Sequence, residues 1–317
     1  MPAITRNRIG APIPRAATDT RTPMNLTRLR ETFAAYAFLA PVIFGFFLFV
    51  LGPAIAAVGL SFYNYDVLTP PKFVGWANYL RVLRDPRLPL IYWNTVIYVF
   101  WYVVLTTVLG LALAVAANRA MHALWRYLIR TSYFFPVLTS LASVSLVWQY
   151  LYSTDFGIIN YYLGKFGIAR IPWLTSSQWA IYSIILLGVW KNLGFNFVLL
   201  VAGLQNIPRH LYEAAEIDGA GRWASFRYVT LPSLSPVMFF VIVWGLINAF
   251  QVFDSPFILT TGGPGDASRT VVMYIYESGF RYFQMGYAST IALSLFVIVV
   301  ILTILQFRLG RIWVFYQ

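Results

Sequence analysis

The chain has 317 residues, of which 59% are hydrophobic and only 11% are charged, and its mean hydropathy is +0.68. These values exclude an ordinary soluble domain, in which about a quarter of the residues are charged. Because the chain contains no cysteine, disulfides and thiolate chemistry are excluded as well. The net charge of +12 comes without a nucleic-acid recognition module, so we expect the basic residues to contact anionic membrane lipid and no nucleic acid.

In chain order, the sequence begins with a segment, 1–32, that is rich in arginine and proline and lacks the apolar core of a secretory signal. We expect a basic, disordered, cytoplasmic tail. Apolar runs follow that are long enough for a helix to cross a bilayer, and a stub of residues 309–317 ends the chain. The runs cover 33–60, 92–117, 131–152, 179–204, 236–258 and 286–308. Since they lack the alternating polarity of barrel strands, they predict an all-α polytopic membrane protein with six transmembrane helices in one domain, 33–308.

Lysine and arginine indicate how these helices are oriented. The tail, 118–130, 205–235 and the C-terminal end together hold 14 of them, and the loops between hold 8, four of which lie in the loop 61–91, so the excess is modest. Basic loops favour the cytoplasmic side. Both termini and the segment 205–235 are therefore predicted to be cytoplasmic.

Catalytic chemistry is not indicated anywhere in the sequence. There is no G-x-x-x-x-G-K-[ST] phosphate-binding loop, and the two histidines, His122 and His210, have no metal-ligand spacing. The apolar runs hold only isolated ionisable residues, Lys191 and Asp254, rather than a cluster facing a cavity. Transport is favoured over catalysis, and no cofactor is expected on this chain.

The segment 205–235 is a polar island between two apolar runs. We expect one short helix from Pro208 to about Asp218, a turn at the following glycines, and a second helix over 223–230 that ends at Pro232, with Pro236 opening the next span. Its acids, Glu213, Glu216 and Asp218, offer acceptors for a partner's cations. Small residues would let another backbone approach closely, namely Ala214, Ala215, Gly219, Ala220 and Gly221. The alternative is a solvated connector held by ion pairs from Arg209 to Glu213 and from Asp218 to Arg222.

Polar side chains also interrupt the fourth and fifth apolar runs, with Lys191, Asn192 and Asn196 in the former and Asn248, Gln251 and Asp254 in the latter. Amides beside aromatic rings suit a sugar, because hydroxyls need paired donors and acceptors. The alternative is that these amides join neighbouring helices. The charge of Lys191 is expected to face water, to pair with Asp254, or to meet an anionic substrate.

The polar island resembles the EAA loop of the permease subunits of bacterial ABC importers. The match rests on Glu213-Ala214-Ala215, Asp218-Gly219-Ala220, Phe226, Leu231-Pro232 and Pro236. The opening "FLAPVIFGFFLFVLGPAIAAVGLSF", the "GLQNIP" before the loop and the later "FDSPFILTTGGPG" resemble the carbohydrate-uptake branch of this family, which includes maltose, glycerol-3-phosphate and lactose permeases. The resemblance extends over residues 33–308.

The resemblance implies a type I importer permease in the bacterial inner membrane. It implies that Glu213 to Gly221 enter a cleft of a dimeric cytoplasmic ATPase, whose subunits bind ATP and Mg. Other implied partners are a second, paralogous permease and an extracytoplasmic sugar-binding protein. Carried over from the maltose permease, the substrate positions fall near Trp190, Leu193, Gly194, Phe197, Gly245 and Ala249. The alternatives are an anionic or polyol substrate such as glycerol-3-phosphate and, outside this family, a secondary transporter driven by an ion gradient or a membrane scaffold protein without a pathway.

Overall fold

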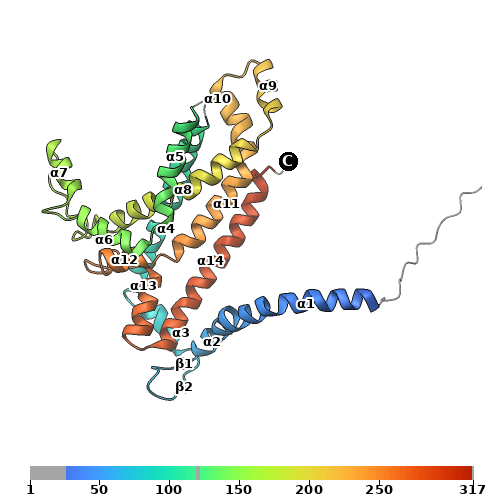
Figure 1. Ribbon diagram of the computed structural model, residues 1–317. Coiled ribbons are helices and arrows are strands. Elements are labelled where there is room, and N and C mark those ends of the chain that lie inside the picture. The colour runs from blue at the N-terminus through green and yellow to red at the C-terminus, as the bar shows by residue number, and fades with distance from the viewer. Residues whose placement is uncertain (1–25, 119–121, 316–317) are drawn as a thin grey trace, which may run out of the picture. The chain divides into compact units, whose positions relative to one another are not determined.

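The computed structural model describes residues 26–118 and 122–315 (Figure 1). Most of the expected tail, 1–25, lies outside the described residues. The described chain divides into two compact units, one that ends at Ile55 and one that begins at Ala56.

The first unit is helical and its apolar side chains are exposed. Helix α1 (Leu26–Phe46) begins inside the segment expected to be a tail and is followed by a π-helical turn, η1 (Phe47–Leu51). Together with α2 (Gly52–Leu60), it gives an apolar stretch long enough to cross a membrane. Phe33 and Phe38 are 76% and 84% exposed. Such a surface needs lipid or another protein against it.

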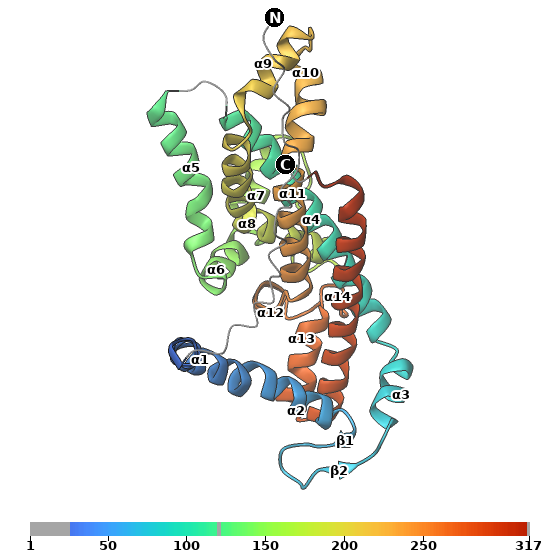
Figure 2. The same ribbon diagram turned by 90° about the vertical axis from the view of Figure 1, so that its right-hand side faces the viewer.

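Four long apolar helices run side by side in the second unit (Figures 1 and 2). They are α4 (Leu88–Ala117), α8 (Ala180–Gln205), the continuous helix Arg222–Phe250 and α14 (Met285–Trp313). Within the described residues, the chain has five helices fit to cross a membrane, or six if one bent pair counts as a span. The predicted helical, multi-span membrane protein is therefore confirmed, although α14 continues beyond residue 308 into the expected stub.

The bent pair replaces the continuous third span that we predicted over 131–152. Helix α5 (Ala123–Leu138) and helix α6 (Leu141–Leu151) meet at 102°. The backbone is extended at the two residues between them, Thr139 (ψ 153°) and Ser140 (ψ 130°). Pro136 provides no amide hydrogen near the break, and the Thr139 hydroxyl donates to the Pro136 carbonyl at 2.6 Å. The apolar composition of this segment predicted its membrane location and not its bend.

The fifth span also differs from the prediction. We expected a helix break at Pro232 and a span over 236–258, but α10 (Arg222–Ser225), the π-helical turn η2 (Phe226–Thr230) and α11 (Leu231–Phe250) form one helix through both prolines. Pro236 has no amide hydrogen for the Pro232 carbonyl, and the Ser235 hydroxyl donates to that carbonyl instead, at 2.6 Å. The helix ends at Phe250, and a separate short helix, α12 (Asp254–Leu259), follows.

The core lies around α4 and α8, which pack closely at glycines. A Cβ on Gly110 would lie 3.2 Å from the Cβ of Asn196, and one on Gly188 would lie 2.5 Å from the Tyr98 hydroxyl. The larger buried cluster joins α4 and α8 to α14 and to α13 (Val271–Tyr276), and a smaller one joins the ends of α4 and α8 to the start of α11.

Short elements complete the second unit. Strands β1 (Tyr63–Asn64) and β2 (Lys72–Phe73) pair antiparallel, with Tyr63 opposite Phe73. They lie with α3 (Ala77–Arg84) at one end of the unit, and α9 (Arg209–Ile217) lies at the other end (Figures 1 and 2). Helix α7 (Ile158–Lys165) precedes α8, and η3 (Glu277–Arg281) follows α13.

Candidate functional site

The loop that joins the fourth and fifth spans ends its first helix at a left-handed glycine. Helix α9 begins after Pro208 and is followed by Gly219 with φ +73°. The Ala220 amide donates to the Ala215 carbonyl (2.8 Å) and the Gly219 amide to the Glu216 carbonyl (3.0 Å), which together form a Schellman motif. The predicted first helix and its glycine stop are therefore confirmed.

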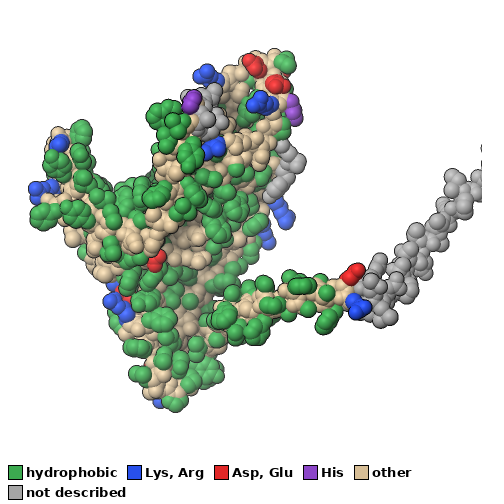
Figure 3. All heavy atoms as spheres, in the orientation of Figure 1, with side chains coloured by type: hydrophobic (Ala, Val, Ile, Leu, Met, Phe, Trp, Pro, Cys, Tyr) green, Lys and Arg blue, Asp and Glu red, His purple; other side chains and the backbone are tan. Residues whose placement is uncertain are grey.

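The acidic side of this loop is open. Glu213, Glu216 and Asp218 are exposed, and within the described residues none of them forms an ion pair or a side-chain hydrogen bond. The connector hypothesis, with its pairs from Arg209 to Glu213 and from Asp218 to Arg222, is not supported by this geometry. Acidic and basic side chains gather at this end of the unit, whereas hydrophobic side chains cover most of the visible face below it (Figure 3).

The loop surface also carries exposed apolar and small residues. Ile217 is 86% exposed, Trp223 74% and Tyr228 75%. Among the predicted contact residues, Ala214, Gly219 and Gly221 are exposed and Ala215 and Ala220 are half-buried. Added Cβ atoms at Gly219 and Gly221 would meet nothing within 4 Å. The loop surface around these two glycines is therefore open.

Helix α9 contacts the helix of the fifth span and the buried cluster at its start. The Tyr212 hydroxyl lies 3.0 Å from the Thr230 hydroxyl, and Leu211 and Tyr212 pack against the buried cluster formed by Phe197, Leu200 and Leu234 with their neighbours. Since α10, η2 and α11 are one helix, the loop continues without a break into the membrane span.

The predicted pathway residues separate into two groups. Trp190, Asn248, Gln251 and Asp254 are exposed and Asn192 is half-buried. The amides of Asn192 and Asn248 each donate to the carbonyl four residues earlier, Gly188 (3.0 Å) and Trp244 (2.8 Å), which leaves their amide oxygens without a donor among the described side chains. This group is available to a substrate.

The other predicted pathway residues are packed inside the unit. Phe197 is fully buried, Asn196 is 5% exposed, and Gly194 and Gly245 are buried. A Cβ on Gly194 would lie 1.9 Å from the Tyr133 carbonyl oxygen, so this glycine is needed for the close approach of α5 and α8. In this conformation these residues shape the helix packing and do not face an open pathway.

Lys191 neither faces water nor pairs with Asp254, two of the outcomes that we expected. Its ammonium nitrogen lies 2.8 Å from the Thr139 carbonyl oxygen, 3.1 Å from that of Pro136 and 3.3 Å from that of Val137. The side chain is 7% exposed, and in the described chain it forms no ion pair with Asp254 or any other acid. The charge is bound by backbone carbonyls at the break in the third span.

Two cavities lie in the second unit, and the smaller one is lined by the predicted pathway residue Trp190. A cavity of about 370 Å³ lies between α4, α6, α7 and α8 and is lined by Trp148, Tyr152, Trp173 and Trp190 together with aliphatic residues. A more open cavity of about 880 Å³ is lined by Trp93, Asn94, Gln178, Tyr182 and Pro264 among others. Within the described residues, no group of three or more His, Cys, Asp or Glu side chains could hold a metal ion.

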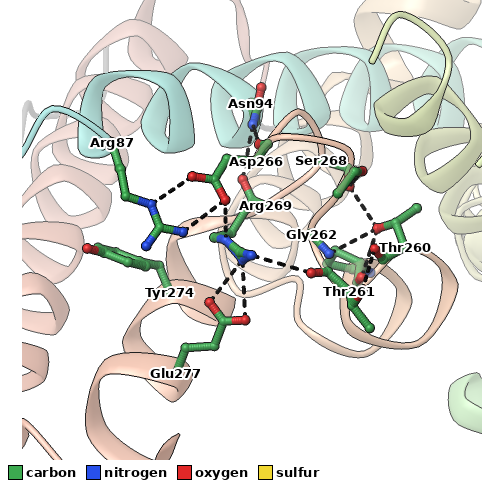
Figure 4. A network of polar contacts seen from close by, with 12 residues as sticks. Arg87, Asn94, Thr260, Thr261, Gly262, Asp266, Ser268, Arg269, Tyr274 and Glu277 are labelled. Atoms are coloured by element: carbon green, nitrogen blue, oxygen red, sulfur yellow. Dashed lines mark hydrogen bonds and ion pairs between the residues drawn. The ribbon is translucent and has the colours of Figure 1, made fainter. Parts of the chain in front are cut away.

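An ion-pair network, which the sequence did not reveal, fixes the glycine-rich segment 260–270 (Figure 4). Arg87, at the start of α4, donates to both carboxylate oxygens of Asp266, from Nε at 2.7 Å and from Nη2 at 2.9 Å. Arg269 donates to Asp266 at 2.8 Å and to Glu277 at 2.9 Å. Asn94 donates to the carbonyls of Asp266 and Arg269. Arg87 lies 179 residues and Asn94 172 residues from Asp266, so no local pattern predicts their contacts with it.

The network shifts the pKa values of two acids. Hydrogen bonds from Arg87, together with the charge of Arg269, hold the pKa of Asp266 below its usual value despite partial burial. Burial alone would raise the pKa of Asp85, but hydrogen bonds from Tyr274 (2.6 Å) and Tyr287 (2.5 Å) outweigh it and lower that pKa. Both carboxylates are therefore stabilised in their ionised form.

The described helices form a multi-span membrane protein with an open loop attached to one span. Comparison with known proteins gives the family: residues 106–312 match the model of the binding-protein-dependent transport system inner membrane component. The chain belongs to this family.

Named relatives and solved structures agree with this assignment. The chain is 35% identical to the probable ABC transporter permease protein YesP of Bacillus subtilis, over 91% of this chain and 94% of that protein. It is 33% identical to the trehalose/maltose transport system permease protein MalF of Thermococcus litoralis, over 90% and 98%. A chain in the crystal structure of a bacterial alginate ABC transporter, in complex with an alginate pentasaccharide-bound periplasmic protein, has the same fold, with a TM-score of 0.80 at 22% identity over 91% and 98% of the two chains.

Proposed function

We propose that this chain is a permease subunit of an ATP-driven importer that takes up carbohydrate delivered by an extracytoplasmic binding protein. It pairs with a second permease to enclose the pathway, and it performs no catalysis itself. ATP and Mg are bound by a dimeric ATPase on the cytoplasmic side. Relatives named for trehalose and maltose and for lactose transport support the carbohydrate class.

The observation that carries this proposal is the loop from α9 to α10. It presents unpaired acids, small residues and exposed apolar side chains at one end of the second unit, and its second helix continues into the fifth span. Closure of the ATPase dimer would move α9 and thereby tilt α11, which is rigid-body switching around a central site. Glu213 offers a carboxylate to a cation of the ATPase, and Gly219 provides the turn.

The orientation follows from the same arrangement. If the loop faces the cytoplasm, the C-terminal end of α14 faces it too, because the Phe315 amide donates to the Ser235 hydroxyl near the start of α11 (2.9 Å). Basic residues at both ends of the chain support a cytoplasmic location for both termini.

A neutral substrate is favoured over an anionic one by the contacts of Lys191. Its ammonium is saturated by three carbonyls and offers no free charge to a phosphate or carboxylate. The exposed amides Asn248 and Gln251 and the exposed ring of Trp190 provide hydrogen bonds and an apolar face for sugar rings.

Reconstitution tests the proposal. The complete importer, with its ATPase and binding protein, is placed in proteoliposomes, and ATP hydrolysis is measured with sugars, polyols and glycerol phosphates in turn. We expect a neutral sugar to stimulate hydrolysis and to be taken up without an ion gradient. Uptake that needs a proton or sodium gradient and no ATP would indicate a secondary transporter. Absence of any stimulated hydrolysis would favour a scaffold role.

A further inference from the structure

The break between α5 and α6 leaves backbone carbonyls without helical partners. In an unbroken helix, the carbonyls of residues 136, 137 and 139 would accept from amides four residues later. Helix α6 departs at 102°, so its first amides do not reach them. In the described chain, the Thr139 amide (3.2 Å) and the Thr139 hydroxyl (2.6 Å) both donate to the Pro136 carbonyl, and no backbone amide beyond the break donates to the carbonyls of Val137 and Thr139. Unpaired carbonyls inside an apolar protein are costly.

Lys191 provides the missing donors from the neighbouring helix. An ammonium group has three hydrogens and no acceptor, which matches the three carbonyls that it contacts at 2.8, 3.1 and 3.3 Å. Its positive charge also faces the C-terminal end of α5, where the helix dipole is negative. The carbonyl oxygens at the break therefore accept the hydrogen bonds of the ammonium group and stabilise its positive charge.

The position of Lys191 is fixed by tight packing next to it. Three residues further along α8, Gly194 lies against the backbone of α5, where an added Cβ would meet the Tyr133 carbonyl at 1.9 Å and the Phe134 Cα at 2.9 Å. Since the two helices touch here, the Lys191 side chain has only a short distance to cover to the carbonyls beyond.

We propose that Lys191 is a positioning residue that fixes the bend of the third span, and that its charge is not used to recognise substrate. The bend sets the direction of α6, whose Trp148 ring lies 5.4 Å from the exposed Trp190 ring at the aromatic cavity. Loss of the ammonium would release α6 and with it one wall of that cavity. Only the transport readout below rests on the proposed importer function.

Distances between spin labels test the bend directly. The chain has no cysteine, so Leu128→Cys on α5 and Tyr150→Cys on α6, both at exposed positions, can be labelled specifically before the chain is assembled with the other subunits. We expect a narrow distance distribution with Lys191 and with Lys191→Arg, which keeps charge and donors. Lys191→Met is expected to broaden and shift the distribution. Lys191→Gln keeps two N–H donors but no charge, and its distance distribution should be intermediate in width. This variant provides the uncharged test if the Met variant does not insert in the membrane.

Transport by the same variants separates positioning from recognition. Lys191→Met and Lys191→Gln should lower turnover while the ranking of neutral and anionic solutes stays the same, and Lys191→Arg should restore turnover. An unchanged distance distribution in both uncharged variants would overturn the proposal, as would a selective loss of anionic solutes with the bend intact. The distance measurement needs no substrate, so its result stands even if carbohydrate-stimulated hydrolysis is not found.

Discussion

Arg87 and Asp266 are 179 residues apart and form a bidentate ion pair. This pair attaches the segment before α13 to the start of α4. The Arg87 side chain also lies 5.0 Å from the centre of the Tyr274 ring. The pair therefore joins the second and sixth spans through the segments next to them, at a point where the amino acid sequence shows only a glycine-rich turn.

Replacing Asp266 with Asn should lower the stability of the second unit by about 1–2 kcal/mol, because charged hydrogen bonds to Arg87 and Arg269 are lost while Arg87 remains partly hydrated. Thermal unfolding in detergent measures this loss. Asp155→Asn is the matched control, since its pair with Arg170 is about two-thirds exposed on both sides, and it should change stability by less than about 0.5 kcal/mol. Equal effects of the two substitutions would contradict a stabilising role for the network.

The contribution of Asp266 should depend on pH in a defined direction. Its pKa is lower in the folded protein, so the stabilisation is present above the unfolded value of about 3.9 and is lost as pH falls through the lowered folded value. The difference in melting temperature between the native chain and Asp266→Asn should therefore be full at pH 7 and should shrink below about pH 4. A difference that grows as the solution is acidified would be inconsistent with this pKa direction.

Gly219→Val should abolish substrate-stimulated ATP hydrolysis while the chain still inserts in the membrane. The cost arises from the left-handed backbone, about 1–2 kcal/mol, and not from a clash, because an added Cβ meets nothing within 4 Å. Gly219→Asn is the matched control, since asparagine tolerates this conformation, and it should retain most of the coupling. Full transport by the Val variant would contradict the role given to this turn.

Glu213→Gln should weaken binding of the ATPase without changing the stability of the chain by more than about 0.5 kcal/mol, because the carboxylate is exposed and, in the described residues, unpaired. Affinity is measured by titrating the purified ATPase onto the permease pair in nanodiscs. Glu216→Gln, also exposed and acidic, tests whether the effect is specific to Glu213. A loss of stability with unchanged affinity would mean that Glu213 acts inside its own chain.

Asn248→Ala and Gln251→Ala should raise the KM for substrate and leave stability almost unchanged, since both side chains are exposed. Gly194→Ala should instead lower stability, because its Cβ would collide with the backbone of α5. Uptake kinetics and thermal unfolding of the three variants distinguish the two groups. If Gly194→Ala alone changed KM and remained stable, the substrate would lie between α5 and α8.

The sequence predicted the parts of the structure that depend on composition and local pattern. Long apolar runs predicted the spans, and Pro208 and Gly219 predicted the limits of α9. The sequence did not predict the features that depend on contacts between helices. The carbonyls at the break accept from a lysine 52 residues away from Thr139. Near Pro236 the Ser235 hydroxyl donates to the carbonyl that the proline leaves without an amide. Asn196 and Phe197 are buried by α4 and α5. Polarity within a span does not distinguish a side chain that faces a pathway from one that faces another helix.

Cross-linking from α9 tests whether the loop from α9 to α10 is the surface that binds the ATPase. Ala214→Cys introduces the only thiol of the chain, on the exposed side of α9, and Leu68→Cys is the control because it is 82% exposed near the β-hairpin at the opposite end of the second unit. With a bifunctional thiol-to-amine reagent in the assembled importer, Ala214→Cys is expected to cross-link to the ATPase subunit, with a yield that changes when ATP is added, and Leu68→Cys is expected not to. If the ATPase were cross-linked to Leu68→Cys and not to Ala214→Cys, the ATPase would bind at the opposite end of the second unit and not at α9.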